Sequence, residues 1–218
     1  MNPLGTVMSL TALSLRSKAL ASVALVGSVA AVAGLGTFGS FTSSTTPANQ
    51  QVVSGTVAIA IGAAGSATNR LTVAATGLVP GDTVARAVQL TNAAGNQGLS
   101  SITLSNLDST PSLLSTDGTN GLQLMVQSCP TAWTEAGTAP AYTYTCTGTA
   151  TTVMASRPVS IPSGSAVTLA GLNSLAAGGA DNLLFTETFP TVAGNSLQTL
   201  TSNIAFTFTG TQRAGTAK

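Results

Sequence analysis

The stretch "DTVARAVQLTN" at residues 82–92 carries the clearest secondary-structure signal in the chain. Every second residue from Val84 to Leu90 has a bulky side chain, and the residues between them are Ala or Gln. Strict alternation of this kind places the bulky side chains on one face of an extended strand. The stretch therefore predicts a β-strand with one buried face, which ends at Asn92.

The same period of two recurs along the chain beyond Pro47. Gly, Pro, Asn and Asp separate the alternating runs, as they do in turns between strands. Only "LNSLAAGGA" at 172–180 favours a short helical turn. Further strands are predicted in "VVSGTVAIAIG" (52–62), "SSITLSNL" (100–107), "GLQLMVQSC" (121–129), "AYTYTCTG" (141–148), "SAVTLAGL" (165–172), "DNLLFTETFP" (181–190) and "SNIAFTFTGTQ" (202–212).

Most of these predicted strands have one apolar or aromatic face. About eight to ten antiparallel strands of this kind are typical of two packed sheets that share a core. The sequence thus predicts an all-β fold, a jelly-roll-like antiparallel β-sandwich over residues 55–213, preceded by a cleavable N-terminal signal helix. The expected inward residues include Val57, Ile59, Ile61, Ile102, Leu104, Leu122, Leu124, Val126, Tyr142, Tyr144, Cys146, Ile204, Phe206 and Phe208.

The chain is unusually poor in charge. Charged residues make up 6% of its 218 residues and the formal net charge is +1, whereas an ordinary soluble domain has roughly 25% charged residues. Without a basic stripe, nucleic acid is not an expected partner. Sheet edges with so few charges are open to pairing with another strand. Composition alone leaves two explanations, a subunit that polymerises through its edges and a secreted protein with a biased composition.

Residues 1–39 are predicted to be a secretory signal peptide. Arg16 and Lys18 precede an uncharged run at 19–41, which is the order of the positive and apolar regions of such a peptide. A run of about 20 apolar residues also fits a transmembrane helix. The run at 19–41 consists largely of Ala, Gly, Ser and Val, and no cluster of positive residues follows it. Both features favour a cleaved signal peptide over a retained transmembrane helix.

Small residues near the end of this run place the cut after Gly39 or Ser40. The chain is then expected to meet the membrane only transiently, through its signal peptide. The mature protein is expected outside the cell, at the cell surface or in a matrix around it.

Cys129 and Cys146 are the two cysteines of the chain. In an exported protein, a lone cysteine pair is most simply a disulfide. A metal site is the alternative, but further thiolate or imidazole ligands are lacking because the chain has no histidine. Closing a loop of this length stabilises a fold by roughly 3 kcal/mol. The disulfide would hold Trp133 in a loop over the sheet, as a lid or as a platform for a ligand.

The acidic residues give no sign of an active site. No two of them lie within four residues of each other, so the sequence contains no local acid pair or calcium loop. Serine has no histidine partner for nucleophilic catalysis. We therefore expect no enzyme activity, no cofactor and no metal. The six carboxylates are Asp82, Asp108, Asp117, Glu135, Asp181 and Glu187.

Several stretches together resemble the TasA/camelysin family of exported bacterial surface and matrix proteins. They are "GLGTFGSFTS" (34–43), "SGTVAIAIG" (54–62), "LTVAATGLVPGDTVARAVQLTNAAGNQGLSSITL" (71–104) and "NIAFTFTGTQ" (203–212). These stretches stand in the order that the family shows, and the middle of the chain looks like an actinobacterial version. The resemblance implies a jelly-roll subunit that a dedicated signal peptidase releases and that assembles into extracellular biofilm-matrix fibres.

In the family, the N-terminal segment of one subunit adds as a strand to its neighbour. By position, the donor segment here would be residues 40–54, with Phe41, Val52 and Val53 as its apolar side chains. Pro47 would interrupt the ladder unless its position faces away from the acceptor. The expected partner is therefore another copy of the same chain.

Two other functions are considered. The family also carries a metalloendopeptidase label through camelysin, yet this chain has no His-Glu-x-x-His motif and no clustered acids. A monomeric surface adhesin that binds carbohydrate or protein through Trp133 is the third hypothesis.

Overall fold

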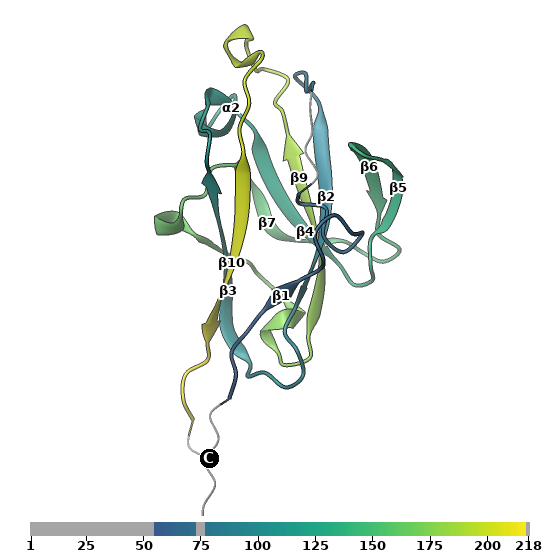
Figure 1. Cartoon of the computed structure of the whole chain (residues 1–218), viewed down its shortest axis with the longest axis vertical. Coiled ribbons are helices and arrows are strands. Elements are labelled where there is room, and N and C mark those ends of the chain that lie inside the picture. Colours follow the sequence, from purple (N-terminus) through teal and green to yellow (C-terminus); the bar gives the residue numbers. More distant parts are fainter. Residues whose placement is uncertain (1–54, 73–76, 217–218) are drawn as a thin grey trace, which may run out of the picture. The chain divides into compact units, whose positions relative to one another are not determined.

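The computed structural model describes residues 55–72 and 77–216. In this part of the chain, ten strands form antiparallel sheets and a single short α-helix, α2 (Leu113–Thr116), interrupts them (Figure 1). The prediction of a mostly β fold with antiparallel pairing is confirmed. The predicted signal helix, the cleavage site at Gly39 and Ser40 and the predicted donor residues Phe41, Val52 and Val53 lie outside the described residues.

The larger sheet has five strands in the order β1-β2-β9-β4-β7. Its central pairing joins β2 to β9 over nine residues in one unbroken register, from Thr83 opposite Thr188 to Thr91 opposite Ala180. The pairing of β4 with β7 is irregular at two points. The strands are β1 (Ala60–Ile61), β2 (Thr83–Thr91), β9 (Ala180–Thr188), β4 (Gln123–Cys129) and β7 (Thr151–Pro158).

The smaller sheet has three strands in the order β10-β3-β8. β10 (Ile204–Gln212) pairs with β3 (Leu99–Asp108) along its whole length. On the other side of β3, β8 (Val167–Thr168) adds two residues. β10 therefore lies at the margin of this sheet, as Figure 1 shows in yellow.

One hydrophobic core joins the two sheets. Phe185 of β9 is 1% exposed, and its ring contacts Phe206 and Phe208 of β10 edge to face at centroid distances of 5.0 and 6.0 Å. Leu90 of β2 and Ile102 of β3 are fully buried in the same cluster. The alternation predicted for β3, β4 and β10 is confirmed, because their predicted inward residues lie in this core or pack against it. On β2, Val88 and Leu90 lie in the core, whereas Val84 and Arg86 are buried outside that cluster, and Ala87 on the opposite face is buried too.

A third, two-stranded sheet stands apart from these two. It is the hairpin of β5 (Thr134–Thr138) and β6 (Ala141–Thr145). Tyr142 and Tyr144 point to one face of β6 as predicted, and both are half-buried. The hairpin contacts the larger sheet through β2.

Some elements differ from the prediction. β1 comprises two residues only, and Val57 and Ile61 are 36% and 46% exposed, so the predicted inward face there is wrong except for Ile59, which packs against the core. β5, β7 and α2 were not predicted. The helical turn predicted within 172–180 is present as a 3-10 turn at Asn173–Leu175. Two further 3-10 turns are Ser163–Ser165 and Asn195–Leu197.

Candidate functional site

The outer edge of β10 is the longest unprotected edge in the described structure. β10 has nine residues, "IAFTFTGTQ". Its strand partner, β3, lies on one side, and no described strand pairs with the other. Exposed backbone N–H and C=O groups in such a row are a template for another strand.

The core-facing side chains of β10 lie only partly inside the core. Ile204, Phe206 and Phe208 are half-buried, whereas Phe185 behind them is 1% exposed. Within the described residues, these side chains are therefore incompletely covered. A strand added beside β10 would cover them and bury further apolar surface, which is the main favourable term in association.

The edge of β10 lacks the protection that natural edge strands usually carry. Such strands are short, or they contain Lys, Pro or a bulge that prevents pairing. The residues Ile204–Gln212 include no charged residue and no proline, and their register with β3 shifts only at Thr211 and Gln212. The first charge beyond the strand is Arg213.

The other edges among the described strands are short or protected. β1 and β8 have two residues each. β7 has eight residues, but it ends in Arg157 and Pro158 and is irregularly paired with β4. The amide of Ala170 also donates to the carbonyl of Val153 on that strand at 3.1 Å. β10 is therefore the edge best suited to accept a strand.

The chain enters the described structure close to the end of β10. The carbonyl of Thr56 accepts a hydrogen bond from the amide of Gln97 at 2.7 Å. Arg213, which follows β10, donates from Nη2 to Oε1 of the same glutamine at 3.3 Å. Residue 55 and the end of β10 thus lie at the same end of the sheets, next to Gln97.

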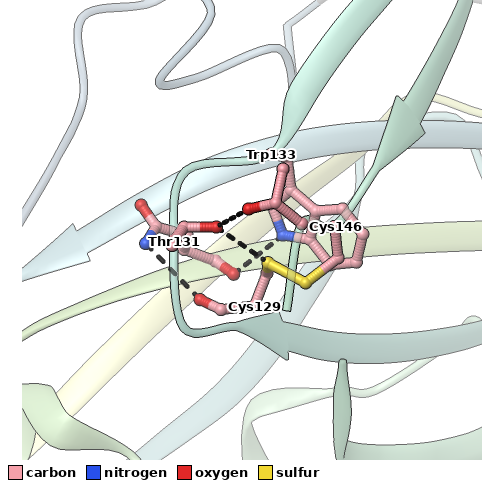
Figure 2. The surroundings of a disulfide bond; sticks show 6 residues. Cys129, Thr131, Trp133 and Cys146 are labelled. Carbon is pink, nitrogen blue, oxygen red and sulfur yellow. Dashed lines mark hydrogen bonds between the residues drawn. A yellow bond between two sulfur atoms is a disulfide. The ribbon is translucent and has the colours of Figure 1, made fainter. Parts of the chain in front are cut away.

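The predicted disulfide between Cys129 and Cys146 is confirmed. It joins the end of β4 to the residue after β6, with a Cα–Cα distance of 5.8 Å. Figure 2 shows Trp133 in the loop that the disulfide closes. The indole Nε1–H of Trp133 donates to the carbonyl of Asn182 at 2.8 Å, and this bond ties the start of the hairpin to β9.

A polar cluster fixes the hairpin against the edge of β2. Arg70 donates to both carboxylate oxygens of Glu135 at 2.9 and 2.6 Å, and the Tyr144 hydroxyl donates to Oε2 of Glu135 at 2.9 Å. The guanidinium of Arg70 lies 4.7 Å from the centre of the Tyr142 ring, and that of Arg86 lies 5.8 Å from it. No sequence signal indicated this cluster, because Arg70 and Glu135 are 65 residues apart.

The electrostatics of the cluster follow from these contacts. The hydrogen bond from Arg70 is the main cause that lowers the pKa of Glu135 below its usual value. Burial, followed by the hydrogen bond to Glu135, raises the pKa of Tyr144 to about 12. Glu135 is therefore ionised and Tyr144 is protonated at neutral pH, which is the pairing that the hydrogen bonds require.

Two of the remaining carboxylates accept hydrogen bonds from backbone amides. Asp181 is 1% exposed and accepts from the amides of Asn173 and Ser174. Asp82 accepts from the amide of Val79 within a turn. Residues 55–72 and 77–216 contain no group of three His, Cys, Asp or Glu side chains that could hold a metal ion. Nor does any helix among them have the length and apolar character needed to cross a membrane.

Comparison with known proteins adds no assignment. No protein-family model matches the chain, and a search of curated proteins finds no significant match.

Proposed function

We propose that this chain is an exported structural protein that assembles into extracellular fibres by adding a strand of one molecule to the sheet of the next. The partner is another copy of the chain, and the contact is β-augmentation, in which main-chain hydrogen bonds provide affinity. The protein acts without enzyme activity or cofactor, at the cell surface or in a biofilm matrix. A signal peptidase releases it, and nucleic acid has no part in its function.

The observation that carries this proposal is the outer edge of β10. Nine residues without charge or proline present their backbone to a partner. Behind that backbone, Phe206 and Phe208 are half-buried against Phe185. A row of unpaired backbone groups beside incompletely covered aromatic side chains is what an added strand would satisfy.

The strand order supports a jelly-roll class for the fold. In a jelly roll, two Greek-key halves place the first strand next to the last in one sheet. The order β2-β9-β4-β7 in the larger sheet and the neighbouring pair β3-β8 in the smaller sheet agree with that arrangement. β1 and β10 are then additions at the margins, and β10 is the one that leaves a long edge.

The donor in this proposal is residues 40–54, "SFTSSTTPANQQVVS". Cleavage after Gly39 or Ser40 frees this segment, and its Ser, Thr and Val content suits an extended strand. Phe41, Val52 and Val53 supply its apolar side chains. Pro47 must lie where its missing N–H faces away from β10, since proline cannot donate to the ladder.

A relationship to the TasA/camelysin family remains part of this proposal. Its support is the order of the four stretches of sequence described above, which ends with β10 itself. The peptidase activity associated with camelysin is not proposed for this chain, because the sequence has no histidine and no clustered acids.

Deletion of residues 40–54 tests the proposal. The full-length gene is expressed in a host that exports the chain, and the protein recovered outside the cell is examined by electron microscopy. Filaments are expected from the unaltered chain. The deletion variant is expected to lose them while it keeps the β circular dichroism spectrum and the disulfide, because the segment precedes the folded sheets. Equal filament formation by both proteins would contradict strand donation by this segment.

A further inference from the structure

The two ends of the sheets differ in their surface chemistry. We call the end where β2 and β10 begin and β3 ends the loop end. We call the opposite end, where residue 55 enters beside Gln97, the entry end. The turn at 77–82 joins the turn at 189–195 at the loop end, because the amide of Gly81 donates to the carbonyl of Phe189 at 2.8 Å. Helix α2 contacts the 3-10 turn at Asn195–Leu197, so it belongs to the same end.

The loop end exposes large apolar side chains. Val79, Leu113 and Val192 are 58%, 50% and 72% exposed and come from helix α2 and two turns at this end. Single exposed apolar residues are normal, but a group of them rimmed by polar residues marks an interaction surface. The entry end exposes Val57 and Ile61, at 36% and 46%. The described structure therefore has an apolar group at each of its two ends.

The two ends also carry opposite charge. Asp82, Asp108 and Asp117 lie in the turns and at the strand end of the loop end. Hydrogen bonds from the amides of Asn120 and Thr119 lower the pKa of Asp117, which stays ionised at neutral pH. Arg157, near the end of β7, also lies at this end, and its Nε atom is buried. At the entry end Asp181 is buried, and Arg213 is the charged side chain at the surface.

The direction of strand addition decides which ends meet. Every strand pairing in these sheets is antiparallel. β10 runs from the loop end to the entry end. An antiparallel donor beside it must run towards the loop end of the acceptor, and there it must continue into residue 55 of its own molecule. Residue 55 lies at the entry end of the donor molecule, so this end faces the loop end of the acceptor.

The lengths agree with this arrangement. The nine residues of β10 span about 30 Å, while residues 40–54 can extend to about 50 Å. The segment can therefore pair with the whole of β10 and leave a connection of a few residues. So short a connection holds the two molecular ends close together.

We propose that the loop end of one molecule packs against the entry end of the next, with Val79, Leu113 and Val192 on one side and Val57 and Ile61 on the other. Arg213 faces the carboxylates of the neighbouring loop end. This contact rests on the proposed strand donation and adds a second, side-chain interface to it. Because the two surfaces differ, the contact is heterologous and repeats into an open filament rather than a closed dimer.

Charge variants at exposed positions test this contact. Val192→Lys changes the loop end, and Arg213→Glu changes the entry end. Ala155→Lys is the control, because Ala155 is exposed in the middle of β7, away from both ends of the sheets and from β10. All variants are exported as full-length chains, checked for the wild-type fold by circular dichroism and assembled at a series of concentrations.

Each end variant is expected to raise the critical concentration for filament formation about tenfold, and the control less than about twofold. A critical concentration equal to that of the wild type for both end variants would overturn the end-to-end contact and leave strand donation intact. An equal loss from Ala155→Lys would also overturn it, because added charge far from both ends would then have the same effect. Absence of filaments from the wild-type chain would overturn the proposed function and this contact together.

Discussion

At the scale of single residues, Glu187 is an ionisable group whose charged form is disfavoured by folding. It lies on β9 opposite Val84 on one side and Leu124 on the other, and both neighbours are core residues. Burial raises the pKa of Glu187 above its usual value, and the nearby charge of Arg86 lowers it in part. Compared with the unfolded chain, the folded protein therefore binds the proton of this carboxyl group more tightly.

Replacing Glu187 with Gln removes this penalty. For a group whose pKa is raised by folding, the stabilising contribution is fully present below the unfolded pKa and is lost as the pH rises through the folded pKa. Glu187→Gln is therefore expected to increase the free energy of unfolding at pH 7 by on the order of 1 kcal/mol. The difference is expected to vanish near pH 3, which is well below the usual glutamate pKa of about 4.3, because the carboxyl group is then neutral in both the folded and the unfolded chain. Urea denaturation at the two pH values measures it.

Glu135→Gln provides the matched control with the opposite sign. Arg70 lowers the pKa of Glu135, so its contribution to stability is present at neutral pH and is lost as the pH falls through the folded pKa. This variant is expected to be less stable than the wild type at pH 7. A loss of stability in Glu187→Gln at pH 7 would contradict the interpretation of the buried carboxyl group.

At the scale of elements, β10 is the strand proposed to accept the donor segment. Its outward residues Ala205, Thr207 and Thr209 are exposed, so a lysine there can be accommodated without repacking. Thr207→Lys is expected to leave the free energy of unfolding within about 0.5 kcal/mol of the wild type. Because lysine on an edge strand opposes pairing, the variant is expected to assemble at least about tenfold less readily. Light scattering against protein concentration measures the change.

A lysine on a central strand serves as the control for this variant. Thr186 lies on the outward face of β9, between β2 and β4, where no edge is exposed. Thr186→Lys is expected to assemble like the wild type. If both variants lose assembly alike, added charge rather than protection of the β10 edge is responsible.

The alternating strands could be predicted from the sequence because one of their faces is buried and the other is not. Leu90, Ile102 and Phe206 mark such faces, and each lies in or against the core. β7 could not be predicted in this way. Its buried residues Val153 and Met154 are adjacent, and the irregular pairing with β4 breaks the period of two.

Elements that depend on distant contacts also could not be predicted from the sequence. Helix α2 has four residues, too few for a helical period. Its N-cap residue Ser112 accepts a hydrogen bond from the amide of Leu114, and its hydroxyl also bonds to that of Ser202, 90 residues away. The hairpin of β5 and β6 likewise depends on Arg70 and Glu135. The disulfide was predictable because only one pairing of two cysteines exists.

At the scale of the whole molecule, the proposed donor segment lies outside the residues that build the core. The core between the sheets is built from residues within 59–208, and the unprotected edge of β10 lies beside it. Residues 40–54 precede all described strands. A chain that folds first and is cut at its signal peptide would then carry both a donor segment and an acceptor edge, which is sufficient for a polymer of one component.

The most direct test asks whether residues 40–54 of one molecule reach β10 of another. Thr207→Cys is mixed before assembly with a second variant that carries a single new cysteine at each position from 45 to 51 in turn, because an antiparallel donor places one of these residues opposite Thr207. Each mixture is oxidised, and the products are separated without reductant. Both native cysteines are in the disulfide, so the new thiols are the ones free to react. Strand donation predicts a cross-linked product that contains one chain of each variant and forms only under assembly conditions. Abundant filaments without this mixed product would contradict it.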